Sequence, residues 1–375
     1  EENAQTETHF PRYIAAQDPF LDIRAMQWQT ANGGEYRLDF EGDIFQTEDQ
    51  RNWGDASYKT FCTPLSRPFP VQLQPGDKVW QRVTLRPISI PAASLSRSEE
   101  KPELFKKKFQ LGIAAAVETG QLAEKAVGLL KSLDLGHYRI DLALSDPNWI
   151  TKFSNHCENA ALLNLPLEVA LFLADAFEGQ LADFLGVCQQ NGLKVKHLLL
   201  FSAQQLVTPQ SLIDYIPTLK RQLAHTKIGV GTDQNFTELN RNRFEVGEAD
   251  FVSFSFDPQE HASDDLSLME NTETVQYSVA SAENLYGKPV HLSFIALRKR
   301  SNPYATNPTD FVLTIEKQVD SRQNTNFAKE WTAKVLAHLS QTNVVSVTMF
   351  RTVGELGIMN EKGEGYPVFE ALLQR

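Results

Sequence analysis

Charged and imidazole side chains occur within and just after several apolar segments in the second part of the sequence. Arg139 and Asp141 stand two residues apart in one such segment, so in a β-strand both side chains point to the same side. Buried charges are normally paired, and the two residues therefore fit an internal ion pair as well as a catalytic role. The other candidates for catalysis or substrate binding in this part are Glu118, Asp233, Glu238, Asn240, Asp257, Gln259, His261 and Asp264.

A second candidate region is the segment of residues 47–61, TEDQRNWGDASYKTF, which combines acids, bases, amides and aromatic rings. Trp53 could offer a flat face to a sugar ring, while Arg51, Asn52 and Lys59 could donate hydrogen bonds to hydroxyl or carbonyl oxygens. The alternative is a salt-bridged interface between this segment and the rest of the protein. On the first interpretation the substrate-binding residues here are Glu48, Asp49, Arg51, Asn52 and Trp53, with Lys59 as a catalytic candidate.

Eight apolar segments alternate with amphipathic stretches of helical period from about residue 104 to the end. Strands that are buried on both faces are nearly continuous apolar runs, and helical crossovers make them parallel. Eight such units close naturally into a (β/α)8 barrel, whose active site lies at the carboxyl ends of the strands. A doubly wound open sheet is the alternative, but no GxGxxG motif follows the first strand. The expected strands are residues 109–117, 136–144, 165–174, 195–203, 227–232, 249–256, 288–297 and 343–350, and the expected helices include residues 121–134, 177–192, 208–223, 270–287 and 326–341.

Residues 1–92 contain short strand-like runs broken by Asn-Gly-Gly, Pro-Gly-Asp and several prolines, which predicts a small antiparallel β module. A Pro- and Ser-rich segment, residues 88–103, marks the boundary to a barrel domain of residues 104–375. The sequence therefore predicts an α/β protein in which a TIM barrel follows a small antiparallel β module.

Two segments after expected strands are unusually polar or long. Residues 231–243 are rich in polar side chains and contain no helix of normal length, which is typical of a ligand-facing loop. Residues 298–311 contain Asn-Pro twice and have little periodicity, so they form either a lid or a long surface loop.

The charge balance restricts the possible partners. A net charge of -11 and a pI near 5.3 argue against binding to nucleic acid or to an anionic membrane, because phosphate binding needs a basic surface. The cationic runs Lys106–Lys108 and Arg298–Arg300 are interpreted as solvated loop edges. A small sugar-like molecule is the expected partner, and the sequence indicates no oligomeric state.

The cysteines and the first residues bear on the cellular compartment. Cys62, Cys157 and Cys188 show no ligand spacing, so we expect buried thiols rather than disulfides or a zinc site. No apolar run approaches the roughly 20 residues needed to span a bilayer. The polar first residues lack a signal-peptide core, which favours a soluble cytoplasmic protein, whereas a signal removed before Glu1 would place it in the periplasm or outside the cell.

Several stretches are long and unusual in composition, and they span most of the chain from about residue 18. They are FEGDIFQTEDQRNWGDASYKTFCTPLSRPFP at residues 40–70, GTDQNFTELNR at 231–241, FVSFSFDPQEHASDDLSLMENTETV at 251–275, and SVTMFRTVGELGIM at 346–359 followed by YPVFEALL. In this order they resemble the D-apionate lactonase family.

The resemblance implies hydrolysis of the lactone of a branched-chain sugar acid, in the catabolism of a plant-derived pentose, on a barrel preceded by a β domain. Family members extend further at the amino end, so the β module here would be a remnant of a larger sandwich or a shortened branch. The family pattern implies a glutamate at the end of the eighth strand, where this sequence has Arg351. If that glutamate is catalytic, the activity is lost or altered in this chain, with Glu355 as a nearby substitute.

Opening a lactone requires an activated water, a group that stabilises the tetrahedral oxyanion and an acid for the leaving alkoxide. No GxSxG motif is present, so a serine acyl-enzyme is not indicated. No cofactor is expected; the alternative is a divalent metal held by Asp233, His261 and Asp264, although no HxH or HExxH spacing supports it. The hypothetical roles are base for Asp141 or Asp233, oxyanion stabiliser for Lys59, Arg51 or Arg139, and acid for His261.

Two alternatives to a lactonase stay open. A glycoside hydrolase needs two carboxyl groups across the scissile bond, and the commonest barrel type places glutamates after strands four and seven. This sequence has FSAQQ and IALRKR at those places, which weakens the alternative. The other alternative is a catalytically inactive carbohydrate-binding relative, which the Arg351 departure permits.

Overall fold

The computed structural model describes residues 4–30, 32–90, 108–118, 120–306 and 311–374. The chain forms two compact units, one of residues 1–50 and 57–104 and the other of residues 51–56 and 105–375. Most of the expected boundary segment, together with Lys106, Lys107 and residues 307–310 of the expected lid, lies outside the described residues. Among the described helices, none combines the length and the apolar character that a membrane span needs.

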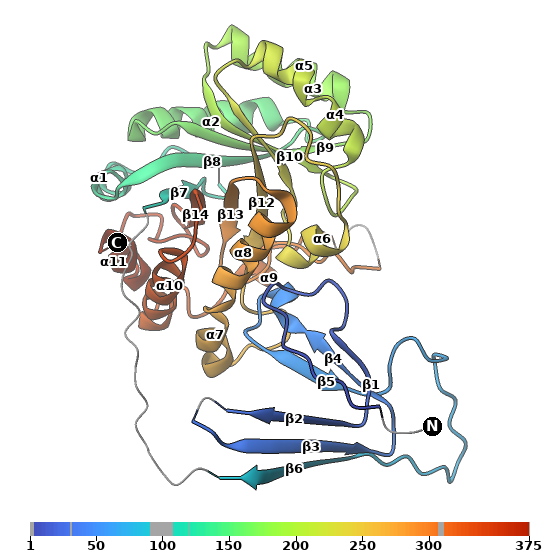
Figure 1. Cartoon of the computed structure of the whole chain (residues 1–375). Coiled ribbons are helices and arrows are strands. Elements are labelled where there is room, and N and C mark those ends of the chain that lie inside the picture. The colour runs from blue at the N-terminus through green and yellow to red at the C-terminus, as the bar shows by residue number, and fades with distance from the viewer. Residues whose placement is uncertain (1–3, 31, 91–107, 119, 307–310, 375) are drawn as a thin grey trace. The chain divides into compact units, whose positions relative to one another are not determined.

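The first unit contains two three-stranded antiparallel sheets, as expected for a small β module (Figure 1). Phe40 and Phe45 are buried on consecutive strands of different sheets, and their rings stack with centroids 4.9 Å apart. One sheet has the order β1-β4-β5 and the other β2-β3-β6, with β1 Phe20–Ile23, β2 Ala25–Gln29, β3 Glu35–Glu41, β4 Phe45–Asp49, β5 Tyr58–Phe61 and β6 Arg82–Ser89.

The second unit is a closed eight-stranded parallel barrel, which confirms the predicted fold class. All eight expected segments form its strands, because each is apolar enough to be buried on both faces. The strands are β7 Gln110–Ala114, β8 Leu135–Ala143, β9 Leu167–Leu173, β10 Val195–Ser202, β11 Lys227–Gly231, β12 Phe251–Phe256, β13 Val290–Ile295 and β14 Ser346–Arg351.

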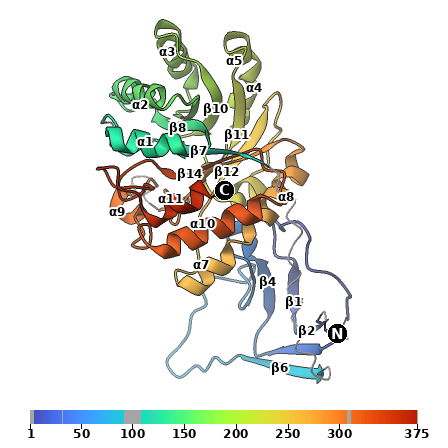
Figure 2. The same ribbon diagram turned by 90° about the vertical axis from the view of Figure 1, so that its left-hand side faces the viewer.

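Amphipathic helices connect the strands and lie outside them, as α2 does beside β8 (Figure 1, Figure 2). Helix α10 shows the pattern, since its buried residues Trp331, Val335 and Leu339 recur every four positions. The helices are α1 Glu124–Ser132, α2 Trp149–Leu163, α3 Phe177–Gln190, α4 Gln210–Asp214, α5 Ile216–Gln222, α6 Phe236–Arg241, α7 Asp265–Asn271, α8 Thr274–Tyr286, α9 Ile315–Gln318, α10 Asn326–Leu339 and α11 Pro367–Leu373, with a 3-10 helix, η1, at Gln50–Trp53.

The continuous helix expected over residues 208–223 is instead divided into α4 and α5. Pro217 lies in the first turn of α5, where its missing N–H is not needed by a helix. In the middle of one long helix the same ring would clash with the preceding turn. The proline therefore sets the division that the apolar periodicity alone does not reveal.

Two glycines make room for large rings inside the barrel. A Cβ on Gly112 of β7 would lie 1.9 Å from Nε2 of His137, and a Cβ on Gly229 of β11 would lie 2.0 Å from the ring of Phe251. Both rings are buried on the neighbouring strand. The barrel interior therefore depends on these positions having no side chain.

We expect Gly112→Ala to destabilise the protein, because the added methyl group overpacks the interior at a typical cost of about 1–3 kcal/mol. A fall in the midpoint of thermal unfolding measures the effect. Gly128→Ala in α1 is the matched control, since no atom lies within 4 Å of the added methyl group. It should be neutral or stabilise by about 0.5–1 kcal/mol. An unchanged midpoint for Gly112→Ala would contradict the packing described here.

Candidate active site

A pocket of about 430 Å³ lies at the carboxyl ends of β11, β12 and β13. This is the end of the barrel at which TIM-barrel active sites occur. We call it the acid-rich pocket because its lining includes four carboxyl groups. It is lined by Trp53, Asp233, Gln234, Asn235, Thr237, Glu238, Ser255, Phe256, Asp257, Glu260, Phe294, Ala296, Arg298, Lys299, Arg300, Ser301, Pro303 and Tyr304.

Three guanidinium groups and two carboxylates form an ion-pair cluster in the mouth of the barrel. Arg139 is fully buried and donates from Nε to Asp141 at 2.7 Å and from Nη2 to Asp233 at 3.1 Å. Arg300 donates to the same two carboxylates, and Nη2 of Arg351 lies 3.6 Å from Asp141. The internal ion pair that was one alternative for Arg139 and Asp141 is therefore present.

The ion pairs decide the protonation of Asp141. Burial alone would raise its pKa, but the guanidinium groups of Arg139, Arg300 and Arg351 outweigh burial and hold the pKa well below its usual range. Burial also raises the pKa of Asp233, and the guanidinium groups offset only part of that effect. Asp141 is therefore a permanent anion that balances charge, and it is poorly suited to accept a proton.

Asp257 differs from these carboxylates because the described structure shows no ion pair to it. It follows β12, is 5% exposed and accepts a hydrogen bond from the backbone N–H of Gln259 at 3.2 Å. Burial, followed by the negative charge of Glu260, raises the pKa of Asp257 to about 7. A carboxyl group with this pKa can both accept and donate a proton near neutral pH.

Residues 51–56, which group with the barrel unit, run close to the backbone of Asp257. Gly54 has a φ of +94°, and a Cβ there would lie 2.6 Å from the carbonyl oxygen of Asp257. Only a glycine allows the chain to run this close to the end of β12. The backbone around Gly54 thus packs directly against the backbone at the end of β12.

Trp53 lies in the acid-rich pocket, but its ring is less open than a sugar-stacking role predicts. The guanidinium of Arg241 lies 4.5 Å from the ring centroid, and the ring of His261 contacts the indole edge-on at 5.5 Å. Its Nε1 donates to Oη of Tyr304 at 3.3 Å. Because Trp53 is 8% exposed, it shapes the pocket wall and offers only a small surface to a ligand.

The rest of residues 51–56 is anchored by hydrogen bonds that involve Asn52 and Asn240, predicted to bind substrate, and His261, predicted to be catalytic. Asn240 donates to Oδ1 of the buried Asn52 at 3.0 Å. Nδ1 of His261 lies 2.7 Å from Asp55, and Asn271 donates to the same carboxylate at 3.3 Å. These hydrogen bonds position the segment.

Glu238 lines the pocket and is held by Tyr304, which donates to Oε1 at 3.0 Å, and by Asn242, which donates to Oε2 at 2.9 Å. Burial raises the pKa of Glu238. Tyr304 therefore joins Glu238 to Trp53 across one wall of the pocket.

Three further predicted residues lie outside the pocket lining. Asp264 caps α7 by accepting a hydrogen bond from the backbone N–H of Ser267, and Gln259 donates to Asp320 at 2.7 Å. Glu118 is exposed after β7. The hydrogen bonds of Asp264 and Gln259 are structural, and all three stay predictions as substrate ligands.

The roles in catalysis or substrate binding predicted for Arg51, Glu48, Asp49 and Lys59 also remain predictions. Arg51 is buried with its guanidinium 5.0 Å from the ring centroid of Tyr277. Lys59 on β5 pairs with Glu48 on β4 at 3.0 Å, and Asp49 accepts from the backbone N–H of Ala15 at 3.0 Å. Each of these contacts lies within one unit.

The interpretation of Arg298–Arg300 as a solvated loop edge is wrong for Arg300, whereas the side chain of Arg298 is 42% exposed. All three line the pocket, and Arg300 is 12% exposed. The backbone N–H of Leu313 donates to the carbonyl of Arg300 at 3.0 Å, and Ser301 pairs with Val312, so the two ends of the long loop hold each other. The sequence did not indicate the role of Arg300, because its carboxylate partners, Asp141 and Asp233, are more than sixty residues away in the chain.

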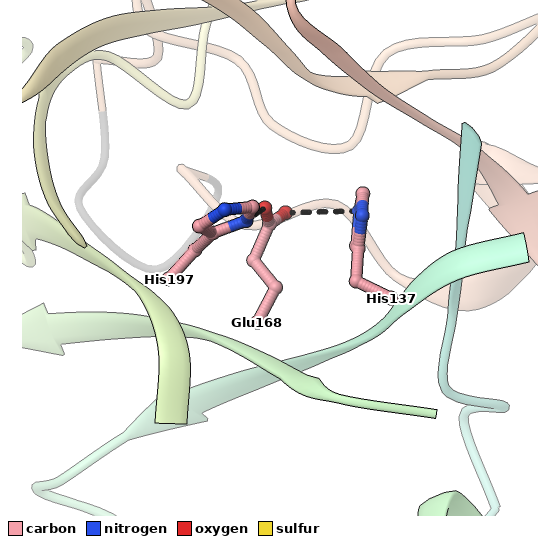
Figure 3. Close-up of side chains that lie close together, drawn as sticks. All are labelled: His137, Glu168 and His197. Carbon is pink, nitrogen blue, oxygen red and sulfur yellow. Dashed lines mark hydrogen bonds and ion pairs between the residues drawn. The ribbon is translucent and has the colours of Figure 1, made fainter. Parts of the chain in front are cut away.

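Sequence analysis also missed a polar cluster at the amino ends of β8, β9 and β10. His137, Glu168 and His197 come from these three successive strands, and their side chains converge on the carboxylate of Glu168 (Figure 3). Their potential ligand atoms all lie within 4.8 Å of one another. The available signal was one polar residue near the start of each of three consecutive apolar segments.

Two imidazoles and a carboxylate are a donor set that can bind Zn²⁺. Here hydrogen bonds already satisfy the carboxylate: Thr348 donates to Oε1 of Glu168 at 3.1 Å, and His197 donates to Oε2 at 3.1 Å. Burial lowers the pKa of His137 to about 4, so its ring is neutral and its Nε2 contacts Thr348 at 2.7 Å. The described contacts therefore account for the cluster as a hydrogen-bond network.

The metal site considered for Asp233, His261 and Asp264 is not assembled. Asp233 is bound to guanidinium groups, His261 to Asp55, and Asp264 to the first turn of α7. Among the described residues, these three do not come within liganding distance of one another.

The chain is similar to known proteins along most of its length. A D-apionate lactonase of Brucella anthropi is 27% identical, and the similarity covers 95% of this chain and 62% of that protein. The chain thus spans less than two thirds of the length of this curated relative. Among solved structures, fungal β-1,4-galactanases match with a TM-score of 0.47, 13% identity and coverage of 71% of this chain and 99% of theirs. An endoxylanase from Clostridium papyrosolvens matches with a TM-score of 0.47, 12% identity and coverage of 72% of each chain.

Two domain families match consecutive parts of the sequence. The family described as D-apionate lactonase, N-terminal domain, matches residues 1–89. The family described as D-apionate lactonase, TIM barrel domain, matches residues 111–374, which include nearly all of the closed barrel. Since that match takes in more than half of the 375 residues, the chain belongs to the D-apionate lactonase family.

Proposed function

We propose that this protein hydrolyses a small, uncharged sugar-acid lactone similar to D-apionolactone. The name of its relative, a D-apionate lactonase, supports this substrate class. The observation that carries the proposal is Asp257, a buried carboxyl group with a pKa near 7 in a polar pocket at the carboxyl end of the barrel. Hydroxyl groups of a sugar would find donors and acceptors around it in Glu238, Tyr304 and Lys299.

In the first step ionised Asp257 takes a proton from a water molecule, whose oxygen forms a bond to the lactone carbonyl carbon. The π electrons of the carbonyl move onto its oxygen. Arg300 supplies the positive charge that stabilises this oxyanion, since it lines the pocket and is held in place by Asp141 and Asp233. A guanidinium fixed by two carboxylates needs little reorganisation when the negative charge develops.

In the second step the tetrahedral intermediate collapses and the bond between the acyl carbon and the ring oxygen breaks. The proton held by Asp257 passes to the leaving alkoxide, which becomes a hydroxyl group of the open-chain acid. The new carboxylic acid loses its own proton to water at neutral pH. One residue then serves as base and acid in turn, which suits a pKa near the working pH.

This assignment replaces the roles that the sequence suggested for the barrel residues. Asp141 is clamped by guanidinium groups, so its low pKa makes it a weak base. His261 is outside the pocket lining and is bound to Asp55, so we propose that it positions Trp53 rather than protonating the leaving group.

Hydrolysis of D-apionolactone and other aldonolactones by the purified protein, followed by proton release or by NMR, tests the proposed function. Aryl glycosides serve as the comparison substrates. We expect turnover of a lactone and none of the glycosides. Glycoside cleavage without lactone opening would overturn the proposal, and so would heat of lactone binding without any product.

Asp257→Asn should lower kcat by about 100-fold or more, because an amide cannot accept the proton. In the unaltered protein kcat/KM should rise with pH through about 7 and level off above it, because the ionised carboxylate is the active form. Asp183→Asn, an exposed change on α3, is the matched control for activity. A pH profile that is flat between pH 6 and 8 would remove Asp257 from the base role.

The same Asp257→Asn variant should be more stable than the unaltered protein at pH 8. The pKa of Asp257 is raised in the folded state, so its contribution to stability is present below the unfolded pKa of about 4 and is lost as pH rises through about 7. An amide at this position does not ionise, so the gain at pH 8 should approach a few kcal/mol, because each pH unit between the two pKa values contributes about 1.4 kcal/mol. Thermal unfolding at pH 5 and pH 8 measures the difference, and an equal effect at both would contradict the buried-acid description.

A further inference from the structure

A second pocket, of about 300 Å³, adjoins the acid-rich pocket and shares Phe294, Ala296, Arg298 and Arg300 with it. Its lining contains three arginines and no carboxyl group, whereas the lining of the acid-rich pocket contains four carboxyl groups. We call it the arginine pocket. The complete lining is Phe294, Ala296, Leu297, Arg298, Arg300, Gln318, Gln323, Phe350, Arg351 and Leu356.

Arg351 has unused hydrogen-bonding capacity in this pocket. Its side chain is 13% exposed; Nη1 donates to the carbonyl of Ala115 at 2.8 Å, and Nη2 lies 3.6 Å from Asp141. Its Nε is buried and has no hydrogen-bond partner among the described residues. A buried donor without an acceptor is uncommon in proteins, so the chain itself satisfies this guanidinium incompletely.

The ion-pair cluster behind the pocket carries an excess of positive charge. Arg139, Arg300 and Arg351 share the carboxylates of Asp141 and Asp233. Burial lowers the pKa of Arg351 to about 10, which still leaves it cationic at neutral pH. The cluster therefore has one positive charge that no described side chain balances within it.

The guanidinium groups of Arg300 and Arg351 both lie beside the ring of Phe294. Its centroid lies 4.0 Å from the guanidinium carbon of Arg300 and 5.6 Å from that of Arg351. Because the aromatic ring covers their faces, the two guanidinium groups donate from their edges, which Asp141, Asp233 and the carbonyl of Ala115 occupy in part. A planar carboxylate is the anion that matches such edges with paired hydrogen bonds.

We propose that the arginine pocket is a carboxylate subsite of the active site. The inference rests on the proposed lactone hydrolysis, which turns a neutral ring into an acid. Arg300 lines both pockets, so a carbonyl attacked in the acid-rich pocket becomes a carboxylate beside Arg300, where the arginine pocket begins. The open-chain acid is then a competitive inhibitor that binds more tightly than an uncharged molecule with the same hydroxyl groups.

The carboxylate could come from either of two sources, which share this chemistry. It could be the group that ring opening creates, or a second acid group that a lactone already carries. The probes are therefore the sodium salt of an aldonate, the alditol of the same carbon chain, and a glucarolactone with its free carboxylate.

Calorimetry with the full chain measures the binding of each probe. We expect one of the two carboxylates to bind at least about tenfold more tightly than the alditol, as a charge-assisted hydrogen bond predicts. Arg351→Gln should remove about 10- to 100-fold of that affinity and leave alditol binding unchanged. Arg298→Gln, at a half-exposed lining residue, should give a smaller loss of carboxylate affinity. It is the test variant if Arg351→Gln does not fold. Arg221→Gln on α5, exposed and outside both pockets, is the matched control.

Preference for the aldonate indicates the product as the source, and preference confined to the glucarolactone indicates a substrate carboxylate. Equal binding of the alditol and both carboxylates overturns the subsite, and so does a preference that survives both arginine variants. Carboxylate binding without lactone turnover would leave the subsite standing and refute the proposed function. Lactone turnover without any preference for a carboxylate would refute the subsite and leave the proposed function standing.

Discussion

One fully buried guanidinium, that of Arg139, holds the mouth of the barrel together. It donates to Asp141 on its own strand, to Asp233 after β11 and to the backbone carbonyl of Ser293 on β13. A buried cation is tolerable only when carboxylates or carbonyl oxygens surround it, so each of these partners is fixed in return. The same carboxylates then hold Arg300, which belongs to a long loop. The ion pair of Arg139 and Asp141, which a spacing of two residues predicted, thus fixes the position of Arg300 in the loop.

The second constraint is the exclusion of water from Asp257. The guanidinium groups keep Asp141 anionic, whereas Asp257 accepts a hydrogen bond from a backbone N–H and forms no ion pair with a described cation. Residues 51–56 run close to the end of β12 because Gly54 has no side chain. The burial of Asp257 favours the protonated form of its carboxyl group. Two kinds of carboxyl group therefore lie in the barrel unit: Asp141 is permanently charged, and Asp257 has a pKa of about 7. Their difference arises from what packs against each of them.

The apolar periodicity is sufficient to predict the barrel, because all eight strands are apolar runs buried on both faces. The same argument places Asp233, Glu238 and Asp257 at strand ends, close to where they line the pocket. It cannot supply partners from distant segments, such as Tyr304 for Trp53 or Arg300 for Asp141. The polar composition of residues 47–61 and 231–243 assigns a ligand role to Asn52 and Asn240, although the amide of Asn240 donates to that of Asn52. Polarity in a sequence shows that a group needs a partner, and only packing shows which partner it has.

The division of charge between the two pockets bears on both binding and release. An array of arginines alone would hold an acid tightly and slow its departure. Here Asp141 and Asp233 already take part of the hydrogen-bonding capacity of Arg300 and Arg139, so only the excess positive charge is offered to a ligand. When an anion leaves, the guanidinium groups keep their own carboxylates and are not left unpaired. Because the carboxylates neutralise the guanidinium groups only in part, the pocket should bind an anion more tightly than a neutral molecule and still release it.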